Sequence, residues 1–517
     1  MNFLKALVFS ILFISLADYA LAQKPSGQFV PDELLVKFRK DAQRKAALKA
    51  HSLIGAKVLE DLGGSGLQRI KLPASAHVAE ILKRYEEFPE VEFVQPNYYY
   101  HLLNTPNDAQ YPNAGMYGLR KISAPQAWDL TTGSSAVVVA NIDTGVRYTH
   151  EDLAANMWTN PGETAGNGID DDGNGFIDDI YGYDFFFNDS DPNDENRHGT
   201  HTAGTIGAVG NNSIGVVGVN WNVKIMAIKI YDSDGFGTTS AMLINAYNYV
   251  RLMKERGVNI RVTNNSYGGC SEACGYDQAT KDAIDALGNA GILNVFAAGN
   301  DNRNTDTLPA YPASYTSPSI LSVAASSSTD TRPVFSNFGV LSVDLAAPGL
   351  GILSTINASN SSYDLLNGTS MATPHAAGAA ALLSAYNPNL SAASLKATLM
   401  NTVDVLPNWN GVVKTGGRLN VSNALLNQTV CSLNTPNSSI TVPTKGGTFS
   451  VNITAPQNCD YSVRSPVKWI KISGPDSLSG NGTFTFRVTV NPTITRSATI
   501  DIGGQTYTVN QSRNGIL

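Results

Sequence analysis

Residues 136–145 read AVVVANIDTG, an apolar β-type run that ends in a carboxylate and a glycine. Similar apolar runs recur later in the chain, at residues 223–230, 259–264, 291–298 and 320–325. Ala-rich helical stretches, such as residues 240–256 and 280–290, lie between them. This alternation is typical of a parallel sheet with helices on both faces, so we predict an α/β fold. In such sheets the site lies at the carboxyl ends of the strands.

Composition narrows the class of protein. The 517 residues include 36 Lys and Arg against 43 Asp and Glu, which gives a net charge of −7. Because there is no basic excess, we expect neither nucleic acid nor a membrane surface as the main partner. A hydrophobic content of 42% is too high for a disordered chain, and the length fits several globular domains.

The two ends of the chain differ from the centre in residue composition and in hydrophobic pattern. Residues 1–22 have a positive residue, an apolar run too short to span a bilayer and a small-residue cleavage pattern, which predicts a secretory signal peptide. A retained amino-terminal anchor is the alternative. Residues 23–103 predict a small α+β domain, and residues 429–517 predict a small all-β sandwich. The α/β domain then covers residues 104–428, and we expect the mature protein to be secreted.

The four cysteines form two local groups. A secreted chain permits disulfides, so we expect Cys270 to pair with Cys274 and Cys431 to pair with Cys459. Two free buried thiols are the alternative for the second pair.

Three patches of small residues each carry one side chain suited to catalysis. Asp143 ends the first strand, His198 opens an Ala/Gly-rich helix, and Ser370 stands where another small-residue helix begins. A serine is a poor nucleophile unless a base takes its proton, and the base needs a partner that fixes its tautomer. Each residue alone would suit a turn or a helix start. Together they predict nucleophilic catalysis by an Asp, His and Ser set.

The sequence around these positions resembles the subtilisin-like serine proteases, or subtilases, and especially their thermitase- and proteinase-like secreted members. The matching motifs are Asp143-Thr144-Gly145, His198-Gly199-Thr200-His201 and Gly368-Thr369-Ser370-Met371-Ala372-Thr373-Pro374-His375. Their order along the chain is that of subtilisin. The resemblance implies that Asp143 orients His198, that His198 is the general base and then the acid, and that Ser370 attacks the scissile carbonyl. It also implies that Asn300 is an oxyanion donor.

The same resemblance implies that substrate binds as an added strand between two edges of the cleft. The implied residues are Ser266, Tyr267 and Gly268 on one edge, Gly235, Phe236 and Gly237 on the other, and Ala297 and Gly299 in the pocket wall. No acid in this pocket set would demand a basic substrate side chain.

Carboxylate spacing predicts bound Ca²⁺. Residues 170–179, DDDGNGFIDD, open like an EF-hand loop, whereas a solvated acidic loop is the alternative. Its expected ligands are Asp170, Asp172, Asn174, the Phe176 carbonyl, Asp178 and Asp179. Asp179 is included because Tyr181 stands where an EF-hand loop usually has its glutamate ligand. The family resemblance adds two further sites. One contains Asp152 and Asn212, and the other contains Asp184, Asp189 and Asp191, beside a Phe187 that replaces an acid.

The flanking domains also resemble known modules. Residues 23–103 resemble the subtilase propeptide, an intramolecular inhibitor that we expect to be removed by self-cleavage between residues 101 and 111. Residues 429–517 resemble BACON-type bacterial β-sandwich repeats, which leaves a polysaccharide or surface ligand and a passive stabilising role as alternatives. We therefore predict a secreted, calcium-stabilised serine endopeptidase that acts on proteins or peptides and is made as a zymogen. A catalytically inactive surface-binding protein on a protease scaffold is the competing interpretation.

Overall fold

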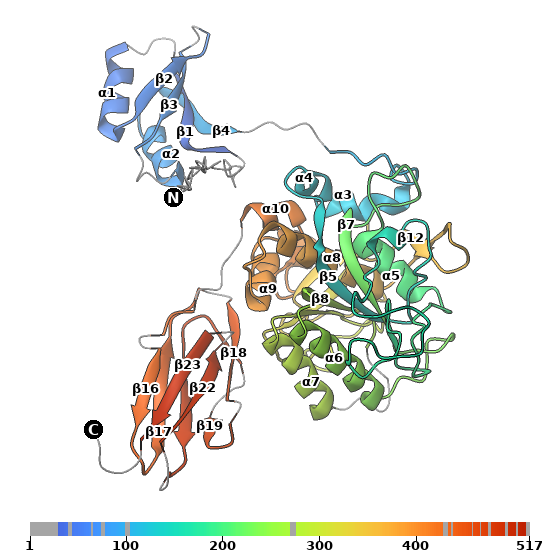
Figure 1. Ribbon diagram of the computed structural model, residues 1–517. Helices are drawn as coiled ribbons and strands as arrows, with labels where there is room; N and C mark the ends of the chain where they lie inside the picture. Colours follow the sequence, from blue (N-terminus) through green and yellow to red (C-terminus); the bar gives the residue numbers. More distant parts are fainter. Residues whose placement is uncertain are drawn as a thin grey trace, which may run out of the picture. The chain divides into compact units, whose positions relative to one another are not determined.

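The computed structural model divides the chain into two compact units, residues 1–100 and 101–517 (Figure 1). The residues described are 29–39, 44–63, 66–73, 78–98, 104–268, 276–427, 433–435, 438–456, 459–465, 467–473, 477–491, 495–502 and 505–512. The predicted signal peptide, residues 1–22, lies outside them.

The N-terminal unit is a four-stranded sheet of order β2-β3-β1-β4 with two helices. Its elements are β1 Phe29–Phe38, α1 Arg44–Ile54, β2 Lys57–Asp61, β3 Leu67–Lys71, α2 Val78–Glu86 and β4 Val91–Tyr98. Leu34, Val36 and Phe38 alternate along β1 and are buried in one cluster with Ile54 of α1 and Tyr85 of α2. Both helices therefore cover the same face of the sheet, and this α+β fold agrees with the prediction.

The second unit is built on a nine-stranded sheet of order β14-β15-β11-β10-β9-β8-β5-β7-β6. The strands are β5 Gly133–Asp143, β6 Gly182–Asp184, β7 Asn222–Lys229, β8 Ile260–Asn265, β9 Leu293–Ala297, β10 Ile320–Ser326, β11 Leu345–Pro348, β14 Asp404–Val405 and β15 Gly417–Arg418. All neighbouring strands run parallel except β14 and β15. The predicted parallel sheet is confirmed.

Helices cover both faces of this sheet, as Figure 1 shows. They are α3 Tyr117–Lys121, α4 Ala124–Trp128, α5 His198–Gly207, α6 Ser240–Glu255, α7 Gln278–Asn289, α8 Thr369–Tyr386, α9 Ala392–Asn401 and α10 Val421–Leu426. The side chains of β5 alternate between two cores. Val139 packs with the helices α5 and α8, whereas Val138 and Ile142 pack with α6 and α7. Burial on both faces explains why the strands are continuously apolar in sequence.

Helix α8 runs through the core of the domain. Every residue from Thr369 to Ser384 is buried, and most of them are alanines or other small residues. A helix that is apolar on all sides lies in a protein interior. Because Ser370 is in its first turn, the fold holds this serine on a buried helix.

The remaining elements are short connections and a separate all-β region. A hairpin, β12 Ile352–Ile356 with β13 Ser362–Leu366, and the 3₁₀ turns η1 Ala114–Met116, η2 Ala154–Asn156 and η3 Pro407–Trp409 complete the α/β domain. The C-terminal region has one sheet of order β16-β23-β22-β18-β20 and one of order β17-β21-β19. Its strands are β16 Ser439–Val442, β17 Gly447–Ile453, β18 Asp460–Arg464, β19 Ile470–Ser473, β20 Ser477–Ser479, β21 Gly482–Val488, β22 Arg496–Ile502 and β23 Gln505–Gln511.

Candidate active site

Asp143 is the last residue of β5, at the carboxyl edge of the sheet, and it is 2% exposed. One carboxylate oxygen, Oδ1, accepts from the backbone N–H of Thr144 at 2.8 Å. The other, Oδ2, accepts from the hydroxyl of Thr202 at 3.2 Å. The chain then turns sharply at Gly145, where φ is +104° and an added Cβ would lie 2.6 Å from the Pro192 carbonyl oxygen. Only a glycine fits this corner.

His198 is the first residue of α5 and lies beside Asp143. Its Nδ1 is 2.7 Å from Asp143 Oδ1. Because a carboxylate can only accept, Nδ1 carries the proton, and the neutral ring keeps Nε2 free to act as a base. The close approach of α5 depends on Gly199, since a Cβ there would lie 2.1 Å from the Gly145 carbonyl oxygen.

The electrostatics of His198 follow from its neighbours. Burial lowers the pKa of His198, but the carboxylates of Asp143 and Asp194 outweigh that effect and raise the pKa above the ordinary 6.5. The nearby His201 is different, because burial lowers its pKa to about 3 and keeps the ring neutral. His201 therefore adds no charge to the site.

Ser370, the second residue of α8, faces the same cleft and is 9% exposed. Its hydroxyl donates to the Ser266 carbonyl oxygen at 2.9 Å, and the Ser266 hydroxyl donates to the Ser370 carbonyl oxygen at 2.9 Å. These two bonds fasten the start of α8 to the end of β8.

Asn300 follows β9 and is held by the residue before Ser370. Its Oδ1 accepts from the backbone N–H of Thr369 at 2.8 Å and from the Thr369 hydroxyl at 3.0 Å. The amide Nδ2 is thereby turned toward the start of α8. A Cβ placed on Gly368 would lie 3.5 Å from Asn300 Nδ2 and 3.5 Å from Ser370 N. Two N–H donors thus flank one small space, which is the arrangement that stabilises an oxyanion.

These side chains line one cleft of about 370 Å³. Six of the predicted substrate residues also line it, namely Ser266, Tyr267, Gly268, Gly235, Ala297 and Gly299. Phe236 and Gly237 do not. Phe236 is 73% exposed, and Gly237 lies against the ring of Phe186. Of the three residues predicted in this loop, Gly235 alone lines the cleft, and the role of the loop in substrate binding stays a prediction.

Two acidic side chains of the cleft were not among the predicted site residues. Asp234 and Asp301 both belong to the lining, whereas Ala297 and Gly299, the residues implied for the pocket wall, carry no acid. Arg303 lies 3.9 Å from Asp301 at an exposed position, where ion pairs are weak. Asp301 directly follows Asn300 in the sequence, so its proximity to the motif was the available signal.

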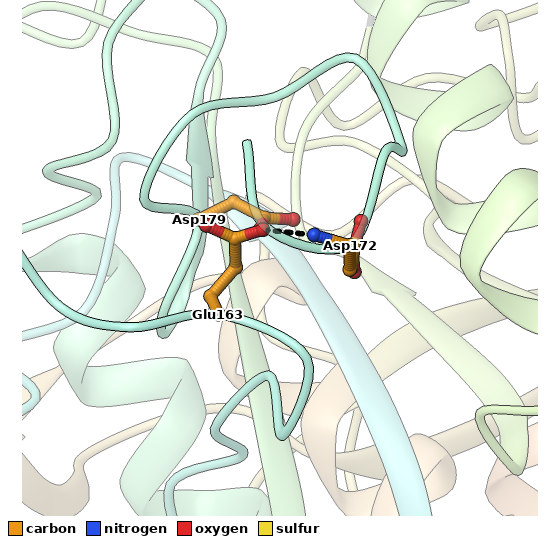
Figure 2. Close-up of side chains that lie close together, drawn as sticks. All are labelled: Glu163, Asp172 and Asp179. Atoms are coloured by element: carbon orange, nitrogen blue, oxygen red, sulfur yellow. Dashed lines mark hydrogen bonds between the residues drawn. The ribbon is translucent and has the colours of Figure 1, made fainter. Parts of the chain in front are cut away.

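The predicted EF-hand-like loop brings together only part of its expected ligands. Among the described residues, one group of three acidic side chains has ligand atoms within 4.8 Å of one another: Glu163, Asp172 and Asp179 (Figure 2). Glu163 was not predicted, and its Oε1 also accepts from the backbone N–H of Asp172 at 3.0 Å. Asp170 instead accepts from the backbone N–H groups of residues 174 and 175, and Asp178 from those of residues 167 and 168.

The charges in this cluster are not fully balanced. Burial raises the pKa of Asp179 to about 6, although Tyr249, Asn160 and Asn174 donate to its carboxylate. Asp172 Oδ1 is buried and receives no hydrogen bond, while Arg256 Nη2 lies 3.1 Å away. A set of carboxylate oxygens with an unsatisfied acceptor is the chemistry that suits Ca²⁺.

The second predicted calcium set is assembled around Asp152, which is fully buried. Its carboxylate accepts from Asn212 Nδ2 and from the backbone N–H of Val216, each at 2.8 Å. Burial raises its pKa to about 7, and the nearby acid Asp108 adds to this shift. Asp108 was not predicted, and its Oδ1 is buried without a hydrogen-bond donor. Oxygen-rich and acidic, this site also suits Ca²⁺.

The third predicted set is not assembled as a cation site. Asp184 Oδ2 lies 2.6 Å from Lys229 Nζ, and both side chains are 2% exposed. Asp184 Oδ1 accepts from the backbone N–H groups of Phe186 and Phe187. Asp189 and Asp191 cap their own turns, because each accepts from a backbone N–H two residues later. The Lys229 ammonium, 4.1 Å from the Phe187 ring centroid, supplies the positive charge here.

The cysteine predictions remain largely outside the described residues. Cys459 is fully buried, and no described cysteine is a free thiol. Cys270, Cys274 and Cys431 lie outside the described part of the chain, so both pairings stay predictions. In that described part, no helix is both long and apolar enough to cross a membrane.

Comparisons with known proteins place the chain in a family of serine proteases. The subtilase family matches residues 134–430, and the fervidolysin N-terminal prodomain matches residues 15–97. The chain therefore belongs to the subtilase family and is a serine-type endopeptidase with an N-terminal prodomain.

Three curated relatives illustrate the similarity. The thermophilic serine proteinase of Bacillus sp. (strain AK1) is 33% identical over 399 residues, which cover 77% of this chain and 88% of that protein. Thermitase of Thermoactinomyces vulgaris is 38% identical over 321 residues, covering 62% and 99%. The extracellular basic protease of Dichelobacter nodosus is 34% identical over 342 residues, covering 61% and 53%.

Proposed function

We propose that this subtilase hydrolyses peptide bonds through an acyl-enzyme, with Asp143, His198 and Ser370 as the catalytic set and Asn300 as an oxyanion donor. One observation carries the proposal. The His198–Asp143 bond of 2.7 Å, the Ser370 hydroxyl, and the donor pair of Asn300 and Ser370 all border the same cleft.

The geometry gives each group a step. In the proposed reaction the Ser370 hydroxyl leaves the Ser266 carbonyl and gives its proton to His198 Nε2 as its oxygen attacks the substrate carbonyl. Asp143 stabilises the imidazolium that forms. The negative oxygen lies between Asn300 Nδ2 and the Ser370 N–H. The imidazolium then gives its proton to the leaving amine, and water repeats the sequence on the acyl-enzyme.

We also propose that Ca²⁺ stabilises the folded enzyme at two places. Glu163, Asp172 and Asp179 would hold one ion, and Asp152, Asn212 and Asp108 would contribute to the other. The supporting observations are the clustered carboxylates of Glu163, Asp172 and Asp179 and the buried Asp108 Oδ1, which has no hydrogen-bond donor. The ion would supply positive charge to buried carboxylates, whereas Asp184 already pairs with Lys229.

The proposed enzyme is a secreted zymogen. The signal-like residues 1–22 and the match of residues 15–97 to a prodomain support export and an inhibitory propeptide. Protein and peptide substrates would add a strand to the edge at residues 266–268. For the C-terminal sandwich we propose a stabilising role, with a polysaccharide or surface ligand as the second option.

The test is hydrolysis of casein by the purified full chain, with and without a serine-directed fluorophosphonate. We expect hydrolysis that the reagent abolishes, with one label on Ser370 found by peptide mapping. The competing interpretation, an inactive surface-binding protein, predicts neither hydrolysis nor labelling. The intact Asp143, His198 and Ser370 favour the enzyme.

A further inference from the structure

A second buried carboxylate, Asp194, lies next to the catalytic set and is 2% exposed. Its Oδ1 accepts from the Thr144 hydroxyl at 2.8 Å and from the backbone N–H groups of Asn196 and Arg197 at 2.9 and 3.1 Å. Its Oδ2 accepts from the backbone N–H and the hydroxyl of Thr200 at 2.9 and 2.6 Å. One side chain thus receives five hydrogen bonds from two segments that are far apart in sequence.

The ionised form of Asp194 accepts all five of these bonds. The Thr144 hydroxyl accepts from the Gly199 N–H at 2.9 Å, and the Thr200 hydroxyl accepts from the Arg147 N–H at 3.0 Å. Each hydroxyl therefore points its own proton at Asp194. Burial raises the pKa of Asp194, but three of its five partners are backbone N–H groups, which can only donate, and both hydroxyls donate to it as well. The carboxylate form is the one that satisfies the network.

The network joins both partners of the catalytic ion pair. Thr144 directly follows Asp143 and donates its N–H to Asp143 Oδ1. Arg197 directly precedes His198 and has a φ of +107°, a conformation that side-chain-bearing residues seldom adopt without support. Asp194 accepts from both Thr144 and Arg197, so it fixes the corner after β5 against the start of α5.

We infer that Asp194 is a positioning residue, an inference that rests on the proposed catalytic set. Asp194 locks the first turn of α5 to the corner at Thr144, so that His198 meets Asp143 in catalytic geometry. It also places a second negative charge near the imidazole. Asp194 is not among the residues that line the cleft. It acts through His198.

The charge surroundings of His198 make this role measurable. The groups that face the imidazole are Asp143 from β5, Asp194 and Arg197 from the segment before α5, and the neutral His201 from α5 itself. Asp234 shares the cleft with it. Asp143 and Asp194 both favour the imidazolium, whereas Arg197 opposes it. Removing the Asp194 charge must therefore lower the pKa of His198.

The experiment compares matched variants of the full chain. Asp194→Asn removes the charge and turns an amide NH₂ toward donors. Thr144→Val removes the hydroxyl that links Asp194 to Gly199, and Thr144→Ser retains it. Asp285→Asn is the control, because Asp285 is another buried carboxylate, paired with Lys281 on α7 and outside the cleft. Active sites are counted by fluorophosphonate titration, so that kcat is expressed per folded site.

For Asp194→Asn we expect kcat per site to fall on the order of ten- to a hundredfold with KM little changed, and the acid limb of kcat/KM to move to lower pH. Thr144→Val should lower kcat in the same direction, and Thr144→Ser should recover most of that loss, whereas Asp285→Asn should match the wild type. A purely structural role would reduce only the number of titratable sites.

The inference is overturned if Asp194→Asn and Thr144→Val keep the kcat and acid limb of the control. If Asp194→Asn does not fold, the Thr144→Val and Thr144→Ser pair decides by the same criterion. An inactive wild type, or an active Ser370→Ala variant, would instead contradict the proposed function.

Discussion

The Ser370 hydroxyl donates to the Ser266 carbonyl oxygen at 2.9 Å, so the nucleophile is held on the edge that is proposed to bind substrate. His198 Nδ1 meanwhile makes its short bond to Asp143. Catalytic hydrogen bonds often tighten only when substrate is present. In this conformation the serine hydroxyl donates to the Ser266 carbonyl oxygen rather than to its base.

Ser370→Ala should abolish hydrolysis and also leave the N-terminal domain attached. Without the nucleophile, no acyl-enzyme can form at the segment between residues 101 and 111. N-terminal sequencing of the protein from a protease-deficient host measures this. Ser384→Ala is the matched control, because Ser384 is a buried serine of the same helix that only bonds the Ala380 carbonyl. Normal processing of the Ser370→Ala protein would contradict self-cleavage.

Asn300→Leu should lower kcat by roughly 10²- to 10³-fold, equivalent to about 3 to 4 kcal/mol, with little change in KM. The amide donor is proposed to act on the oxyanion, which exists only in the transition state. Steady-state kinetics on a chromogenic peptide measure both constants. Asn408→Ala, at an exposed site outside the cleft, should leave them unchanged. A rise in KM alone would assign Asn300 to ground-state binding.

Activity should depend on a group that titrates above pH 6.5. His198 must be neutral to act as base, and its pKa is raised by Asp143 and Asp194 against the opposing effect of burial. The value of kcat/KM should therefore fall as the pH drops through that raised pKa. Asp143→Asn should lower activity by about 10⁴-fold and shift the remaining acid limb downward, since the main charge is lost. A rate maximum near pH 4 would contradict this assignment.

Removal of Ca²⁺ should lower the melting temperature. A ligand at about 100 times its Kd stabilises a protein by about 2.7 kcal/mol, so saturating Ca²⁺ against excess EDTA should give a clear difference by calorimetry. Glu163→Gln and Asp152→Asn should each reduce that difference. Asp191→Asn should not, because the Asp191 carboxylate accepts from the Tyr148 hydroxyl and the Asn193 backbone N–H and belongs to neither proposed site. An unchanged melting temperature in EDTA would refute the calcium proposal.

The sheet and its helices could be predicted because strands that are buried on both faces have continuous apolar runs in the sequence. The missed strands β2, β14 and β15 lack this signal. Residues 57–61 of β2 are almost all exposed, and β14 and β15 contain only two residues each. A pattern-based prediction needs several buried residues in a row to recognise a strand.

The catalytic residues could be predicted from the sequence because each one lies inside a compact motif. Glu163 and Asp108 were not, since each reaches its partners through chain folding: Glu163 stands apart from the acidic run that starts at Asp170, and Asp108 is distant from Asp152. The role of Asp194 was not recognised from the sequence because several other acidic residues lie close to it in the chain. Its available signal was an acidic residue just before a helix start, where the backbone N–H groups favour a carboxylate.

Lys229 has a consequence for where the enzyme can work. Stabilisation by a dissociable ion varies with its free concentration, whereas a charge carried on the chain is present at every dilution. The segment from Asp184 toward His198 is anchored by such a charge. Scarce calcium should therefore loosen the loops around Glu163 and Asp152 first, and the approach to the histidine should keep its shape in metal-poor surroundings.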